Sequence, residues 1–366
     1  MLDHGIYIDD NSRAIDVIGN TIVRGGYSGI KLHNALTINV RDNLVVDTRR
    51  AALDFVYDEE ADPVTNKGLS IEGNTFLSAG AEASITIFSL DPLFDVSKLG
   101  QLARNAYCSP YGPAVVLQDV DGFDFDLSVL ELGDWVSFSG LDTTSTICDV
   151  RLPTFIETGP GNERLANGSF DRDVEGWTPS PEPHAQTYWS DDSNGQLNLR
   201  WLGSDALDFV FLIADVGPLE IGEAFRVDWR GQSLSGIQAY AAPELWDAET
   251  AAPMTEQPHR FLPVPSTTQT AYLRAEKMSS AAWLVFSSYS TELPIALEDV
   301  SVVRASGRFR TQAERLETLI NETDEPALLT VSFDSVDAEG ESYLTGQTVE
   351  VAARTALVLF PLDPAP

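Results

Sequence analysis

The sequence predicts an all-β protein with three parts: a β-solenoid, a β-sandwich and a small terminal β-domain. Three observations lead to this fold class. A four-residue phrase occurs four times between residues 5 and 89. Short alternating apolar and polar strings with regular turn residues fill residues 166–305, and a last group of such strings follows in residues 306–366. Strings of this length and alternation are typical of strands.

The repeated phrase occupies residues 5–8, 29–32, 52–55 and 84–87, so its starts lie 24, 23 and 32 residues apart. Between the copies, an Asn recurs after a short apolar pair, as Asn20, Asn43 and Asn74. A period in the low twenties with β-rich strings and a recurrent Asn indicates a solenoid whose coils stack on one another. The third interval is longer because it contains a polar insertion at residues 58–67, which we interpret as a projecting loop.

Stacking the copies in register divides their side chains into inward and outward columns, because neighbouring residues of a strand point to opposite faces. Two inward columns are apolar: Ile6, Ile30, Leu53 and Ile85, and then Ile8, Leu32, Phe55 and Ile87. The outward columns are Tyr7, Lys31, Asp54 and Thr86, and then Asp9, His33, Val56 and Phe88. The three Asn residues fall on one line, where a ladder of stacked amides satisfies backbone groups at a coil corner.

The predicted boundaries follow changes in this texture. Coils occupy residues 1–100, an irregular wrap that covers the last coil occupies 101–165, the sandwich occupies 166–305, and the terminal domain occupies 306–366. Residues 311–320 are the one stretch that suits a helix. Six of the seven Trp lie in the sandwich; those in polar, loop-like surroundings, Trp189 and Trp246, are predicted to be exposed binding platforms.

Charge restricts the partners. The chain has 56 acidic and 23 basic residues, for a net charge of −33. Such a surface repels phosphate backbones and anionic lipid, which argues against nucleic acid and membrane surfaces as partners. No apolar run reaches the length of a membrane span. Cys108 and Cys148 fit either one disulfide in an exported protein or two buried thiols.

The start of the sequence carries no signal-peptide pattern, and the repeat begins at residue 5 without a capping element. We therefore expect further coils before it. Oligomeric state is left open.

Two phrases resemble a known superfamily. Residues 4–10, followed by residues 29–33, are similar to right-handed parallel β-helix proteins of the pectate-lyase-like, carbohydrate-active superfamily. Residues 105–107 and 134–145 resemble the wrap that ends such helices, and the last sixty residues resemble their small terminal β-domain. The resemblance implies a right-handed parallel β-helix in a secreted, polysaccharide-active protein. It does not name a reaction, because lyases, hydrolases and epimerases share the scaffold.

A second resemblance covers the sandwich. Residues 167–171, 176–177 and 296–302 are similar to jelly-roll carbohydrate-binding modules. This resemblance implies a sugar-binding face and a structural calcium, the only cofactor expected, for which Asp171 and Glu298 are the residues in position. The family commonly has an acid where this chain has Leu297, which weakens the calcium assignment.

The outward columns contain the chemistry that cleaves a glycosidic bond. Adjacent coils lie about 4.8 Å apart, so Asp9 and His33 are predicted neighbours, with Asp10 in the same phrase. Tyr7 and His4 of that phrase are predicted to bind the substrate. Paired carboxyls can donate a proton to the leaving oxygen and activate water, which favours a glycoside hydrolase. In a lyase, His33 or Lys31 would instead remove a proton from an acidic sugar.

Two further interpretations stay open. Lys31 and Asp54, with Tyr7 beside them, are candidates for the same site, although a simple cross-strand ion pair explains them as well. The chain can also be a non-catalytic polysaccharide-binding protein.

Overall fold

The computed structural model describes residues 4–48, 51–57, 67–78, 84–89, 95–108, 115–121, 124–148, 154–181, 184–191, 195–202, 210–233, 242–254, 268–288 and 295–362. The all-β class is confirmed, because strands make up nearly all of the regular structure. The chain forms two compact units, one of Met1–Thr154 with Arg310–Pro366 and one of Phe155–Phe309. The insertion predicted as a loop at residues 58–67 lies outside the described residues except for Lys67.

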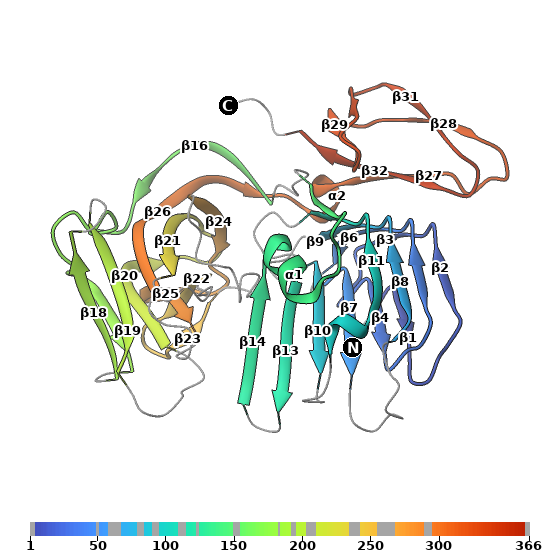
Figure 1. Cartoon of the computed structure of the whole chain (residues 1–366). Coiled ribbons are helices and arrows are strands. Elements are labelled where there is room, and N and C mark those ends of the chain that lie inside the picture. Colours follow the sequence, from blue (N-terminus) through green and yellow to red (C-terminus); the bar gives the residue numbers. More distant parts are fainter. Residues whose placement is uncertain are drawn as a thin grey trace. The chain divides into compact units, whose positions relative to one another are not determined.

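The first unit begins with three sheets of parallel strands that the chain visits in turn, and each of the first four passes adds one strand to every sheet (Figure 1). The first sheet contains β1 (Ile6–Ile8), β4 (Ile30–His33), β7 (Leu53–Tyr57), β10 (Ile85–Ser89) and β13 (Val115–Asp121), with β14 (Asp124–Leu130) antiparallel at its edge. The second contains β2 (Asp16–Ile18), β5 (Asn39–Arg41), β8 (Leu69–Glu72) and β11 (Gly100–Ala103). The third contains β3 (Thr21–Val23), β6 (Leu44–Thr48), β9 (Thr75–Ser78), β12 (Ala106–Cys108) and β15 (Thr146–Ile147). We call this arrangement the coil stack.

The predicted register is confirmed. Ile6 pairs with Ile30, Ile30 with Leu53, and Leu53 with Ile85. The apolar columns form one buried core cluster, in which Ile30 and Phe55 are fully buried. Burial of an aliphatic or aromatic side chain stabilises a fold by about 1.5–3 kcal/mol, so the columns account for much of the stability of the coil stack.

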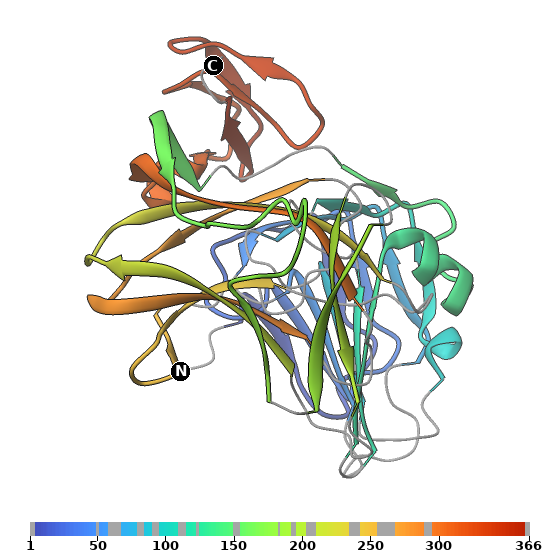
Figure 2. The same ribbon diagram turned by 90° about the vertical axis from the view of Figure 1, so that its left-hand side faces the viewer.

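The prediction that the coils end at residue 100 is wrong, because β11, β12 and β15 add further strands to the second and third sheets. Leu102 continues one apolar column and Tyr107 another. These strands lack the repeated four-residue sequence of the earlier coils, but they keep the alternation of apolar and polar residues that buries one face. The short 3₁₀ helix η1 (Val96–Lys98) precedes β11, and helix α1 (Leu132–Ser139) follows β14. Helix α1 is green in Figure 2. Its Trp135 packs into the core of the coil stack.

The predicted Asn ladder is present and includes Asn105 as a fourth member. The Nδ2 group of each residue donates to the Oδ1 atom of the next, at 2.9 Å from Asn20 to Asn43, 2.9 Å from Asn43 to Asn74 and 3.0 Å from Asn74 to Asn105. The ladder ends on the buried carboxylate of Asp142, which also accepts from the indole of Trp135 at 2.8 Å. All its amides point the same way, so it has a donor end and an acceptor end.

The terminal domain contains α2 (Gln312–Arg315), β27 (Glu317–Ile320), β28 (Ala327–Thr330), β29 (Ser335–Val336), β30 (Ser342–Tyr343), β31 (Thr348–Val351) and β32 (Ala356–Pro361). The helix predicted over residues 311–320 is therefore wrong in its second half. A capping box between Thr311 and Glu314 starts α2, but Leu316 is extended and the following residues pair with β32.

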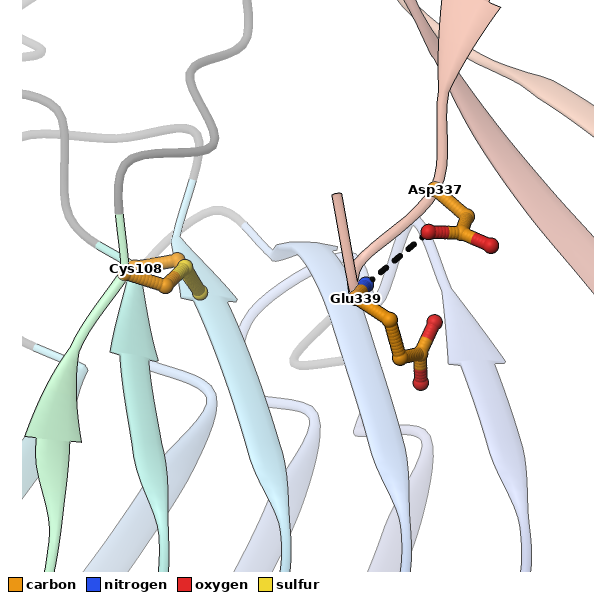
Figure 3. The surroundings of a disulfide bond; sticks show 4 residues. Cys108, Asp337 and Glu339 are labelled. Atoms are coloured by element: carbon orange, nitrogen blue, oxygen red, sulfur yellow. Dashed lines mark hydrogen bonds between the residues drawn. A yellow bond between two sulfur atoms is a disulfide. The ribbon is translucent and has the colours of Figure 1, made fainter. Parts of the chain in front are cut away.

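A disulfide joins Cys108 to Cys148, whose Cα atoms are 4.9 Å apart. It lies beside the turn of Asp337 and Glu339 in the terminal domain (Figure 3). Cys108 shares a buried cluster with Leu316 and other apolar residues of that domain. This cluster holds the domain on the third sheet.

Asp47 sits in the same interface between two arginines. Its carboxylate oxygens lie 3.7 Å from Arg24 and 3.5 Å from Arg315. Burial raises the pKa of Asp47 above its ordinary value, and the two guanidinium groups offset only part of that rise.

The second unit is a sandwich of two antiparallel sheets. One contains β18 (Ala185–Ser190), β19 (Gln196–Trp201), β26 (Ile295–Phe309), β21 (Ala224–Ser233) and β24 (Gln269–Arg274), with β16 (Phe155–Glu163) also paired to β26. The other contains β17 (Trp177–Ser180), β20 (Val210–Leu219), β25 (Ser279–Ser288), β22 (Ala242–Asp247) and β23 (Ala252–Pro253). Trp177 and Trp229 are buried near Phe286. Trp201 is only half-buried.

Candidate functional site

The first candidate site lies on β1 and β4, where the predicted neighbours Asp9 and His33 are in contact. The Nδ1 atom of His33 is 2.9 Å from Oδ1 of Asp9. The hydroxyl of Tyr7 donates to the same carboxylate oxygen at 2.7 Å and is 3.0 Å from the Nδ1 atom of His33. Parallel pairing of Tyr7 with Lys31 sets this geometry, because it brings the ends of the two strands level. We call Tyr7, Asp9, Asp10 and His33 the first-coil cluster.

Asp9 is ionised in this cluster at neutral pH. The hydrogen bond from Tyr7 lowers the pKa of Asp9 most, followed by a backbone N–H at Asp10 and the bond to His33. Its side chain is largely exposed, with a relative accessibility of 61%. Asp9 therefore suits the role of a carboxylate that orients His33 or stabilises positive charge, and is a poor proton donor.

Asp10 and His33 have a further partner in Asn34. The Nδ2 group of Asn34 donates to Oδ1 of Asp10 at 2.7 Å and lies 3.4 Å from Nε2 of His33. Asp9, Asp10 and His33 each offer a ligand atom within 4.8 Å of the others, the one such group found in the described part of the chain. Hydrogen bonds within the cluster already account for the positions of these side chains.

Rings and a cation surround Tyr7, which is 47% exposed. The ring of His4 lies 5.3 Å from it, the ammonium of Lys31 lies 5.2 Å from its centroid, and His33 is stacked at 6.3 Å. His4 also makes an edge contact with Tyr27 at 5.5 Å. The predicted substrate-binding residues Tyr7 and His4 thus lie next to the predicted catalytic ones.

Asp54 does not belong to this exposed cluster. Its register with Lys31 is as predicted, but its side chain is fully buried. One carboxylate oxygen accepts from Ser28 at 3.1 Å and the other from Thr86 at 2.7 Å. These bonds satisfy a carboxyl that the fold has enclosed, so the structure indicates a structural role for Asp54. The ammonium of Lys31 lies over Tyr7 instead.

In the sandwich, neither predicted Trp platform is openly exposed. Trp189 pairs with buried Leu197, so both point to the inner face, and its indole donates to the carbonyl of Phe170 at 2.6 Å. Trp246 is half-buried, donates to the buried carboxyl of Glu244 at 2.7 Å and lies 5.2 Å from the ring of Phe211. Polar neighbours in sequence suggested loops, whereas both residues lie in strands.

The exposed aromatic residue of β18 is Tyr188, which the sequence reasoning missed. It is 41% exposed and points to the outer face with Asn198 and Arg200. The guanidinium carbon of Arg200 lies 5.5 Å from the centre of its ring, and Arg200 also donates to Gln186 at 3.4 Å. The alternation of β18 could have revealed it, because Ala185 and Trp189 share the other face. We call Gln186, Tyr188 and Arg200 the sandwich platform.

A second polar row continues this outer face. The Nε2 group of Gln196 donates to Glu298 at 3.1 Å, and Nε of Arg230 lies 3.7 Å from the other oxygen of that carboxylate. An arginine beside Glu298 supplies the positive charge that calcium would bring. Asp171 is exposed and forms no metal-capable group with Glu298 among the described residues. Among the described residues the structure therefore adds no support for calcium at Asp171 and Glu298, and that site stays a prediction.

Comparisons with known proteins complete the description. No protein-family model and no curated protein matches the chain. Among solved structures, the CBM22-1 xylan-binding domain of Paenibacillus barcinonensis Xyn10C is 12% identical, with 40% of this chain and 97% of that domain covered and a TM-score of 0.31. The mannan-recognising module TmCBM27 is 13% identical, with coverage of 40% and 99% and a TM-score of 0.29. The enzymatically active domain of bacteriophage CBA120 tailspike protein 4 is 11% identical, with coverage of 81% and 44% and a TM-score of 0.28.

Identities and TM-scores this low assign no family to the chain. The described helices include none with the length and apolar character of a membrane span.

Proposed function

We propose that this chain binds polysaccharide through the sandwich platform. The observation that carries the proposal is Tyr188, an exposed ring on a strand face with the guanidinium of Arg200 at 5.5 Å. An aromatic ring packs against the apolar face of a sugar, while planar amide and guanidinium groups bond to its hydroxyls. Gln186 and Arg200, which are paired across the two strands and bond to each other, provide such groups beside the ring.

The polar row beside the platform extends the surface along the strands. Glu298 and Arg230 lie on the same outer face, where one hydrogen bond from the buried Gln196 and one ion pair hold the carboxylate in place. Preorganised polar groups lose little freedom when a ligand binds, which favours affinity. With a net charge of −33, the protein repels polyanions at long range, so we expect neutral glycans to bind best.

Affinity electrophoresis and calorimetry with xylan, mannan, galactan and pectin test the proposal. We expect Tyr188→Ala to weaken binding at least tenfold, which corresponds to about 1.4 kcal/mol. The matched control is Ile221→Ala, because Ile221 is an exposed apolar residue at a turn of the same unit. If Tyr188→Ala keeps wild-type affinity and Trp246→Ala loses affinity, the binding site lies on the opposite sheet and the proposal is wrong.

A second activity, cleavage of the bound glycan, has support in the first-coil cluster. His33 has a carboxylate at its Nδ1 atom, an arrangement that fixes the ring and favours proton transfer at Nε2. Hydrolysis by two carboxyls would have to use Asp9 and Asp10, because Asp54 is buried, and the ionised Asp9 suits the base rather than the acid. The alternative, β-elimination from an acidic sugar, would use His33 as the base, with Lys31 as the nearby cation.

Product analysis separates these chemistries. A lyase leaves an unsaturated sugar that absorbs ultraviolet light, and a hydrolase leaves a new reducing end without that absorbance. Cleavage by wild type that is lost in His33→Ala but kept in Asp54→Asn would support the cluster. Full cleavage in His33→Ala would exclude it, and binding without any cleavage would leave the chain a polysaccharide-binding protein.

Three further expectations belong to the same proposal. The coil stack would be part of a right-handed parallel β-helix of the pectate-lyase-like superfamily, and its ordered parallel sheets support this. The protein would be secreted, which the disulfide between Cys108 and Cys148 supports, because disulfides persist in oxidising compartments. The calcium site at Asp171 and Glu298 stays a prediction, which loss of thermal stability on chelation would test.

A further inference from the structure

We propose that the open edge of the first coil is a docking surface for one further coil of parallel β-strands. The open edge consists of the outer edges of β1, β2 and β3. Each of these strands pairs with the second coil, and on the other side no strand of the described chain pairs with it. Unpaired strand edges carry free backbone N–H and C=O groups and accept added strands readily.

The apolar core remains partly open at this edge. In the second coil Ile30 and Val45 are fully buried, whereas their counterparts in the first coil, Ile6 and Ile22, are half-buried. Asn20 is half-buried too, while Asn43 is 2% exposed. A coil stacked on this edge would bury the same positions that every inner coil buries.

The Asn ladder shows which kind of partner fits. The Oδ1 atom of Asn43 accepts two N–H groups of Asn20, from its backbone at 2.9 Å and its amide at 2.9 Å. Nothing in the described chain donates to Oδ1 of Asn20 itself. The second side-chain N–H of Asn20 donates to the carbonyl of Ile18 in its own coil at 3.3 Å. The corresponding N–H of Asn43 donates to the carbonyl of Val17 in the preceding coil at 2.9 Å.

The free end of the ladder is therefore an acceptor, and it needs a donor. A preceding coil in parallel register supplies one if it carries an Asn at the same corner. A second copy of this chain placed edge to edge by a two-fold axis does not, because two Oδ1 acceptors would face each other. The partner is thus a strand coil with aliphatic residues at the inward positions and a side-chain amide at the ladder position.

Such a coil would also change the first-coil cluster. Its outward side chains would lie about 4.8 Å from Tyr7 and Asp9, which are at the edge of the coil stack. The partner would therefore form one wall of that cluster. This consequence does not depend on whether the cluster is catalytic.

Duplicating residues 5–28 immediately before Gly5 tests the inference in the full chain. The insertion of 24 residues matches the spacing of the first two coils and repeats the natural Ser28–Gly junction. We expect the thermal midpoint to rise by several degrees and the amides of β1 and β3 to exchange at least tenfold more slowly. The control replaces the inserted copy of Asn20 by Asp, whose side chain has no N–H donor, and should lose a measurable part of the gain. An unchanged midpoint, or an equal gain with Asp, would overturn the inference.

The native chain gives an independent test. An open edge predicts amide exchange in the first coil roughly a hundredfold faster than in the second coil. Equal rates would show that the edge is already covered and would overturn the inference. So would a dimer in sedimentation experiments that dissociates in Ile6→Lys, because a second copy would then be the partner.

Discussion

Replacing Asn74 by Ala should destabilise the coil stack far more than the same change at Asn20. Asn74 is 1% exposed, and its Oδ1 atom accepts the backbone N–H of Asn43 at 3.0 Å and its amide N–H at 2.9 Å. Its own amide donates to the carbonyl of Val40 at 2.9 Å and to Asn105 at 3.0 Å.

The magnitude follows from the groups left without partners. A buried donor that loses its acceptor costs about 1–3 kcal/mol. Asn74→Ala leaves two such donors without an acceptor, so we expect the free energy of unfolding to fall by about 4 kcal/mol. Asn20→Ala removes only two donated bonds at a half-buried position, one of them long, for about 1 kcal/mol. Asn43 keeps a bond from the backbone of residue 20 in that variant.

Native-state hydrogen exchange of β5 and β8 in increasing urea measures both losses in the coil stack without interference from the sandwich. If Asn74→Ala does not fold, Asn74→Asp serves in its place, since it keeps the acceptor for Asn43 and turns the two donated bonds into contacts between acceptor oxygens. Equal losses at Asn74 and Asn20 would refute the ladder as a buried, directional network.

Other consequences can be measured directly. Tyr7→Phe should raise the pKa of Asp9 toward its ordinary value of 3.8, which carbon NMR can follow. The ionised carboxylate of Asp9 stabilises the fold, and this contribution disappears as pH falls through the folded-state pKa. In Tyr7→Phe the contribution should therefore be lost at a higher pH than in wild type. Asp47→Asn should not destabilise the protein at pH 7 despite the two neighbouring arginines, and the stability of wild type relative to this variant should fall as pH rises above 3.8, since burial raises the pKa of Asp47. Reducing the bond between Cys108 and Cys148, which closes a loop of 40 residues, should cost about 4 kcal/mol in denaturant titrations.

The fold could be predicted where one residue pattern fixes one geometry. Ile6 and Ile30 fall in register because a period-two alternation leaves a strand one way to bury its apolar face. The contact of Asp9 with His33 followed from the same register. The coil of Leu102 and Tyr107 was missed because its phrase diverges, although its alternation persists.

Exposure could not be predicted in the same way. Register placed Asp54 on an outward column, but its side chain is fully buried and bonds to Ser28 and Thr86. Trp189 and Tyr188 are neighbours on β18, and the pairing with β19 decides which of them faces solvent. The end of α2 was missed because pairing of residues 317–320 with β32 outweighs their helix propensity.

Binding of glycan at Tyr188 is the central claim, and NMR of the ten tyrosines tests it most directly. The chain would be labelled in its tyrosine rings and titrated with a neutral oligosaccharide that the protein retains in electrophoresis. We predict that the ring signals of Tyr188 shift with ligand and that the shifts disappear in Arg200→Ala or weaken there. Saturable binding that leaves the Tyr188 signals unmoved would contradict the account.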